Sequence, residues 1–170
     1  MRKDRKHSRG ITLLEVVFAA AILVIILHSA AKTFLVTASA QQEILTRDVL
    51  DEEVRRTSEQ LANRLRSAGL YTVADVPAAP AVSSKVRFRR SLAFDPEKGH
   101  VWGPEESVSL SRGALWLDTG YQRTPLGLHV TGVTFSLAGR DLTIGLWADS
   151  RGPGGGQVRV FRRSHVTLRN

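Results

Sequence analysis

An apolar run near the amino terminus constrains this chain more than any other feature. The run extends from Ile11 to Ala31, contains neither glycine nor proline, and has Glu15 as its one formally charged side chain. As a helix rising about 1.5 Å per residue it would be roughly 31 Å long, close to the ~30 Å thickness of a bilayer core. A carboxylate within lipid is costly unless it is neutralised, so Glu15 is a candidate functional residue.

The segment before this run sets its predicted orientation. Residues 1–10 carry five basic side chains and a single acidic one, Asp4. The positive-inside rule keeps such a leader in the cytoplasm and places the chain after Lys32 on the far side of the inner membrane.

Two ordinary interpretations compete for this amino terminus. One is a secretory signal peptide cut after Ala38-Ser39-Ala40, and the other is a signal anchor that is never cut. The apolar core of a signal peptide is expected to have roughly 7–15 residues, which is shorter than this run. Neither interpretation accounts for Gly10 or Glu15.

The stretch Gly10-Ile11-Thr12-Leu13-Leu14-Glu15-Val16 resembles the class III signal of type IV pilins and type II secretion pseudopilins. The resemblance implies that a prepilin peptidase cuts between Gly10 and Ile11 and then methylates Ile11. A glycine suits such a cut because a residue without Cβ lets an extended backbone approach the peptidase closely. Phenylalanine is usual in the family where this chain has Ile11, although isoleucine occurs in minor members. The resemblance also implies that Glu15 pairs with the new N-terminal amine of a neighbouring subunit in a filament, so the expected partners are other pilin subunits.

The helical pattern continues beyond the apolar run, through residues 32–69. Apolar side chains recur at intervals of three and four and form one stripe: Val49, Leu50, Val54, Leu61, Leu65 and Ala68. Two acid-first pairs at i,i+4 support the helix: Asp51 with Arg55, and Glu52 with Arg56. Gly69 is the predicted C-terminal cap.

The period of the apolar side chains changes to two in the distal part. The proline-rich stretch Val76–Ala81 predicts an extended linker over residues 70–84. Beyond it the alternation predicts antiparallel strands, with hairpins turning at Ser111-Arg112-Gly113 and Ala138-Gly139-Arg140-Asp141 and with separate last strands starting at Val158 and at His165.

The predicted fold class is therefore α+β: a long N-terminal helix, with a membrane-spanning first half, packed on a C-terminal antiparallel β-sheet head as in pilins. Five segments are expected: leader 1–10, transmembrane part 11–31, amphipathic part 32–69, linker 70–84 and head 85–170. The head resembles J-type minor pseudopilins and W-type minor pilins, on the basis of Leu65–Tyr71 and Val166–Asn170.

Motifs of catalysis are not found in the sequence. It has no phosphate-binding loop, nucleophile elbow or HExxH pair, it has no cysteine, and its five histidines lack ligand spacing. We therefore predict no enzyme, no cofactor and no metal site. Five carboxylates near predicted turns are interpreted as solvated groups rather than calcium ligands: Asp95, Glu97, Glu105, Glu106 and Asp118.

Two basic clusters are interleaved with aromatic side chains. The first contains Arg87, Arg89 and Arg90, and the second contains Arg162 and Arg163. Such clusters can contact the phosphates and bases of DNA. The alternative is that they form the solvent faces of two strands, where charge protects against aggregation.

The sequence therefore predicts a minor pilin or pseudopilin: an inner-membrane, single-pass protein with a cytoplasmic N-terminus and a periplasmic head. It would be processed by prepilin peptidase and then join or prime a type IV pilus or a type II secretion pseudopilus. The alternative is a membrane-tethered module whose basic head contacts DNA during uptake.

Overall fold

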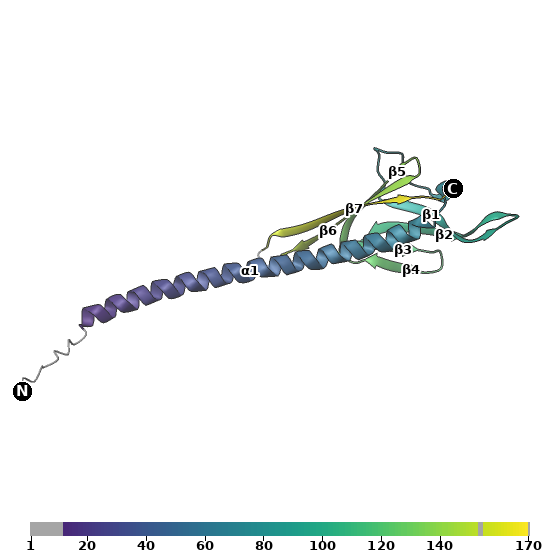
Figure 1. Cartoon of the computed structure of the whole chain (residues 1–170). Helices are drawn as coiled ribbons and strands as arrows, with labels where there is room; N and C mark the ends of the chain where they lie inside the picture. Colours follow the sequence, from purple (N-terminus) through teal and green to yellow (C-terminus); the bar gives the residue numbers. More distant parts are fainter. Residues whose placement is uncertain (1–11, 153–154, 170) are drawn as a thin grey trace, which may run out of the picture. The chain divides into compact units, whose positions relative to one another are not determined.

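A computed structural model describes residues 12–152 and 155–169 of the chain. The chain forms two compact units; the first ends at Gln41 and the second begins at Gln42. The elements follow one another along the chain as α1, a short 3-10 helix η1, and seven strands, β1 to β7 (Figure 1). The predicted α+β class is confirmed, because one long N-terminal helix precedes sheets that are entirely antiparallel.

The first unit consists of the early turns of α1 (Leu13–Arg66). Leucine and alanine are good helix formers, and no glycine or proline interrupts the helix. Its large apolar side chains are exposed; Leu13, for example, is 84% accessible and Phe18 61%. Apolar exposure of this extent needs an environment other than water, such as lipid or neighbouring helices.

The second unit contains the rest of α1, which buries one stripe of side chains. The buried residues are Leu50, Val54, Thr57, Ser58, Leu61, Ala62 and Leu65. The predicted stripe is confirmed at Leu50, Val54, Leu61, Leu65 and Ala68 and is wrong at Val49, which is 66% exposed. The burial of Thr57, Ser58 and Ala62 was not predicted. Burial at Leu50 and Val54 fixes the helix orientation, and Val49 then lies one residue, about 100°, away from the buried face.

One of the two ion pairs predicted on the charged face of α1 has different partners in the structure. Glu52 pairs with Arg56 as expected, with 2.6 Å between Oε1 and Nε. Arg55, however, binds Glu52 and Glu59 at 2.8 Å each rather than Asp51. The two arginines hold the pKa of Glu52 at about 2, chiefly through the hydrogen bond from Arg55.

Four strands form the first sheet, in the order β1-β2-β3-β4. Their bounds are Lys85–Asp95, Gly99–Ser111, Ala114–Asp118 and Arg123–Gly127. The predicted hairpin between β2 and β3 is confirmed, and Arg112 and Gly113 both have positive φ, at 53° and 71°. A two-residue turn with positive φ matches the right-handed twist of the strands that it joins. Strand β4 was not predicted, because its sequence RTPLG has no alternating pattern.

Three strands form the second sheet, in the order β5-β6-β7. Their bounds are Val130–Ala138, Asp141–Arg151 and Gln157–Thr167. The predicted hairpin between β5 and β6 is confirmed. The prediction of two separate last strands is wrong, since β7 is one continuous strand. Positions 162 and 164 face inward but hold the polar residues Arg162 and Ser164. The apolar–polar alternation expected of a strand is therefore interrupted in the sequence, although the strand itself continues.

The segment between helix and strands joins the two sheets. It begins with η1 (Leu70–Thr72) and then forms isolated bridges to edge strands of both sheets. Ala74 pairs with Arg87 of β1, whereas Ser83 pairs with Phe135 of β5. In the second pair each residue donates its N–H to the other's carbonyl oxygen, at 2.9 and 2.7 Å. The segment that was expected to be a linker therefore covers one edge of each sheet.

Gly69 has a different role from the predicted one. Its φ of −83° is ordinary, so it is not a left-handed cap, and α1 ends earlier, at Arg66. The Ser67 hydroxyl donates to the Arg64 carbonyl at 2.8 Å in the last turn. A Cβ at position 69 would run into the Trp102 ring, so this glycine is required by packing.

Candidate functional site

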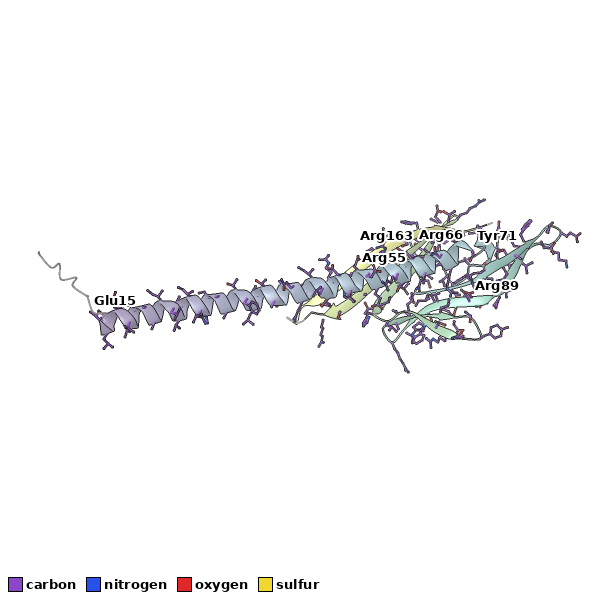
Figure 2. The ribbon with its side chains drawn as sticks, turned by 60° about the horizontal axis from the view of Figure 1, so that its bottom comes forward. Glu15, Arg55, Arg66, Tyr71, Arg89 and Arg163 are labelled. Carbon is purple, nitrogen blue, oxygen red and sulfur yellow. The ribbon has the colours of Figure 1, made fainter. Side chains whose placement is uncertain are left out.

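The residues of the predicted processing site lie at the start of α1. Gly10 and Ile11 are outside the described residues, so the predicted cut and methylation are not addressed by the geometry. Glu15 lies in the first turn of α1, and Figure 2 labels it there. Its backbone N–H donates to the Thr12 carbonyl at 3.1 Å and lies 3.3 Å from the Thr12 hydroxyl oxygen.

Thr12 is thus an N-cap residue, a role that the sequence analysis missed. Threonine followed three residues later by glutamate is a known signature of helix starts and was available in the sequence. The cap orders the first turn at the position of Glu15. The hydroxyl oxygen is a second acceptor for the Glu15 N–H, beside the Thr12 carbonyl, at a helix end where backbone donors lack partners from the preceding turn.

The surface beside Glu15 is hollowed. A shallow depression on the helix is lined by Glu15, Val16, Ala19, Ala20 and Leu23. Ala19 is four residues after Glu15 and therefore follows it on the same helix face. Two alanines leave room beside the carboxylate, and small side chains let another helix approach closely.

Farther along α1, hydroxyl groups are satisfied within the helix itself. Ser29, Thr33 and Thr37 each donate to the carbonyl oxygen four residues earlier, at 2.9, 3.0 and 2.9 Å. Back-bonding of this kind removes the cost of placing a hydroxyl in an apolar environment. Helix α1 contains a stretch that is long and apolar enough to cross a membrane, and none of that stretch is buried.

The first basic cluster lies on β1 and is largely engaged by carboxylates. Arg87 binds Asp75 with its Nε at 2.5 Å, and its Nη1 is 3.4 Å from Glu105. The hydrogen bond from Arg87 is the main cause of the lowered pKa of the Asp75 carboxyl. Arg90 binds Glu106, again at 2.5 Å. Arg89 is exposed and forms no ion pair with any described residue.

The second basic cluster lies on β7, in the other sheet. Arg163 lies over the ring of Phe161, with 5.8 Å between its guanidinium carbon and the ring centroid. Arg162 faces the opposite way and lines a groove beside α1. Figure 2 shows Arg89 and Arg163 on different parts of the second unit. The structure therefore does not join the two clusters into one basic surface.

One of the carboxylates expected at turns has another environment. Glu106 lies in the middle of β2, only 2% exposed, between Arg90 and Arg64, whose Nη1 is 3.4 Å away. Its interpretation as a solvated turn residue is wrong, because the alternation of β2 turns it inward. Across residues 12–152 and 155–169, no three His, Asp or Glu side chains form a group able to hold a metal ion.

Comparison with known proteins identifies the amino-terminal segment. Residues 5–31 match the family model described as the prokaryotic N-terminal methylation motif. The match supports a prepilin-type precursor, similar to those of the type IV pilin and pseudopilin family. This is a family of structural subunits, processed by prepilin peptidase and assembled with other pilins.

The match ends at residue 31, so the similarity of the head to J-type or W-type subunits stays a prediction. No curated protein matches the chain, and no solved structure matches it.

Proposed function

We propose that this protein is a minor pilin or pseudopilin that is incorporated into, or primes, a filament of the inner membrane. In this proposal the chain is cut between Gly10 and Ile11, and Ile11 becomes the methylated first residue. Residues 11–31 anchor the subunit, with the leader in the cytoplasm and the head in the periplasm. The methylation motif at residues 5–31 is the observation that carries the proposal.

The geometry around Glu15 supports the same proposal. Its carboxylate is exposed on the first turn of an apolar helix, beside two alanines. A carboxylate in lipid or between apolar helices is costly unless it is neutralised, and an opposite charge neutralises it. Cleavage after Gly10 creates such a charge, an amine, at the N-terminus of every neighbouring subunit.

The experiment compares the intact mass and N-terminal sequence of the membrane-extracted protein with and without active prepilin peptidase. We expect a chain that starts at Ile11 and carries one added methyl group, formed only when the peptidase is active. Gly10→Val should leave the precursor uncut, whereas the matched leader change Ser8→Ala should be processed normally. A mature chain that starts at Met1 or at Gln41 would overturn the proposal.

The DNA-binding alternative gains no support from the geometry. Arg87 and Arg90 are occupied by carboxylates, and the remaining cations belong to separate sheets. We therefore do not propose a DNA partner. Steeply salt-dependent binding of the full chain to DNA would reopen the question.

A further inference from the structure

A polar groove lies between the last turns of α1 and strand β7. Apart from Ala62, every side chain that lines it is polar. Helix α1 contributes Ser58, Glu59, Asn63 and Arg66, and β7 contributes Arg162 and Ser164. The Ser58 and Ser164 hydroxyls are hydrogen-bonded to each other, so the helix and the strand are held together at this groove. Because lipid chains are held by apolar surface, walls of this kind suit a polar ligand instead.

Arg162 occupies an unusual position in the second sheet. It is half-buried at an inward-facing position of β7, beside α1. Two other arginines of the strand are engaged on its outward face: Arg159 binds Asp149 with 2.9 Å between Nε and Oδ1, and Arg163 lies over the Phe161 ring. No carboxylate in residues 12–152 or 155–169 lies within ion-pair distance of Arg162. An inward-facing guanidinium without an acidic partner is therefore available to a ligand in the groove.

Arg66 adds a second cation to the same groove. It donates to the neutral amide oxygen of Asn63, and it forms no ion pair with the described residues. The one carboxylate in the lining, Glu59, is already bound by Arg55 at 2.8 Å. Two cations that share a groove repel each other, and an anion held between them turns this repulsion into attraction. Figure 2 labels Arg66 near the end of α1, and on β7 it labels Arg163, the neighbour of Arg162 in the sequence.

Carboxylate is the anion that fits these groups best among those that proteins present to one another. The planar guanidinium fork binds a carboxylate through two parallel hydrogen bonds. The head already makes this kind of pair twice between its own elements, from Arg87 to Asp75 and from Arg90 to Glu106. In the groove the cationic half of such a pair is present, and the anionic half has to come from another molecule.

We infer that the Arg66–Arg162 groove is an interaction site that binds an Asp or Glu side chain of a different pilin subunit. The inference rests on the proposed function, because incorporation into a filament places other pilin subunits beside the head. The partner surface is acidic where it meets the end of α1 and β7. A subunit with a lysine or arginine at that point is repelled, so the groove selects among neighbours by charge.

The first test replaces each groove arginine by lysine, which keeps the positive charge and supplies a reactive amine. Membranes with Arg66→Lys or Arg162→Lys, from cells with active prepilin peptidase, are treated with a carbodiimide. This reagent joins an amine directly to a carboxylate that contacts it, and mass spectrometry identifies the two joined residues. We expect a crosslink from position 66 or 162 to an Asp or Glu of a different protein that has a prepilin-type amino terminus.

The matched control for the crosslink is Arg163→Lys. Position 163 is adjacent to 162 in the chain, but its side chain is exposed on the opposite face of β7. It should give no crosslink to a pilin subunit. The inference is overturned by equal crosslinking from position 163, by no crosslink from either groove position, or by one that reaches only Glu59 of the same chain or another copy of it.

The second test reverses the charge of the groove and measures how much of the chain is recovered in sheared filaments. Arg162→Glu and Arg66→Glu should each lower the recovered amount by about tenfold, at the low end of what a close charge pair across an interface contributes. Arg162→Lys should keep most of it, and the control Arg163→Glu should match the natural chain.

The folding of each variant is checked by urea unfolding, followed by tryptophan fluorescence. If Arg162→Glu is less stable than the natural chain, the decision falls to Arg66→Glu, because Arg66 is exposed and its substitution disturbs no core contact. Folded reversal variants that reach the filament as well as the natural chain would contradict the inference.

The two proposals fail in different ways. If the mature chain starts at Ile11 but neither groove lysine is crosslinked to a pilin subunit, the pilin proposal stands and the groove contact is wrong. If the chain is uncut but position 162 is still crosslinked to a pilin subunit, the contact stands without the proposed processing.

Discussion

At the scale of single residues, two carboxylates lie in very different environments. Glu15 is exposed on an apolar helix, whereas Glu106 is almost completely buried between two arginines. The sequence singled out the first, because a charge within an apolar run is visible without a structure. It misjudged the second, because the partners Arg90 and Arg64 lie 16 and 42 residues away.

Glu15→Val tests the proposed role of the first carboxylate. We expect the variant to insert into the membrane and to be cut, but to be lost from the assembled filament, since the neighbouring N-terminal amine then lacks a counter-charge. The backbone N–H that contacts Thr12 is kept, so the helix start should be intact. Incorporation is measured by quantifying the variant in sheared filaments, with Val16→Leu as the control. Normal incorporation of Glu15→Val would favour a simple tether.

Glu106→Ala tests the buried carboxylate. Removing one member of a buried ionic cluster leaves unpaired charge and costs about 3–5 kcal/mol. We expect about 3 kcal/mol or less, since both arginine side chains are 36% exposed and partly solvated. The free energy of unfolding is measured in urea on the detergent-solubilised chain, by tryptophan fluorescence. Glu105→Ala, at a neighbouring exposed position, should cost no more than about 1 kcal/mol.

At the scale of elements, α1 is attached to the turn between β4 and β5 by one carboxylate. Glu53 on the helix accepts hydrogen bonds from the backbone N–H groups of Leu128 and His129, at 2.7 and 3.1 Å. Its other oxygen is 2.6 Å from Nδ1 of His129. Three contacts at one side chain fix where the turn lies along the helix.

This attachment makes stability depend on pH. Burial by itself raises the pKa of Glu53, but the hydrogen bonds from His129 and from the two backbone groups outweigh it, so the pKa lies below its ordinary value of 4.5. With a folded pKa below the unfolded one, the contribution is fully present above about pH 4.5 and is lost as pH falls through the lowered pKa.

The prediction is checked by urea unfolding of the solubilised chain between pH 7 and pH 3. Glu53→Gln should lose stability at pH 7 and show a smaller decline on acidification than the natural chain. His129→Ala keeps the two backbone contacts and should fall between them. An unchanged pH profile in Glu53→Gln would mean that other carboxylates dominate acid unfolding.

At the scale of the whole molecule, the two units differ in what surrounds their side chains. No side chain of the described part of the first unit is buried, whereas the second unit has a core shared by α1 and both sheets. Local stability follows burial and packing, so the two parts of one helix should not have the same stability in water.

Hydrogen exchange followed by mass spectrometry tests this difference. In detergent we expect amides of residues 43–66 to exchange only with unfolding of the head. Amides of residues 33–41 should exchange faster, because they lie beyond the proposed membrane segment and before the head. Equal protection across residues 33–66 would show that packing is not what stabilises the second part.

The sequence by itself determined the features that depend on near neighbours. The length of the apolar run, the single carboxylate within it and the motif at residues 5–31 are all local, as are the period-two strands and their tight turns. Hydrophobic pattern and turn chemistry act over a few residues, so they can be read without coordinates. Even the cap at Thr12 was available in this way.

Only the tertiary structure decided the features that depend on distant partners. These include the division into two sheets, the continuity of β7 through Arg162, the burial of Glu106, and the need for glycine at position 69 beside Trp102. In each case the residue is surrounded by residues that are distant in the sequence. Contacts with these residues decide its structure, even where the neighbouring sequence favours another one. Thus Glu106 in β2 is polar at an inward position because it contacts arginines, and Arg162 in β7 because it lines a groove. Neither residue ends its strand.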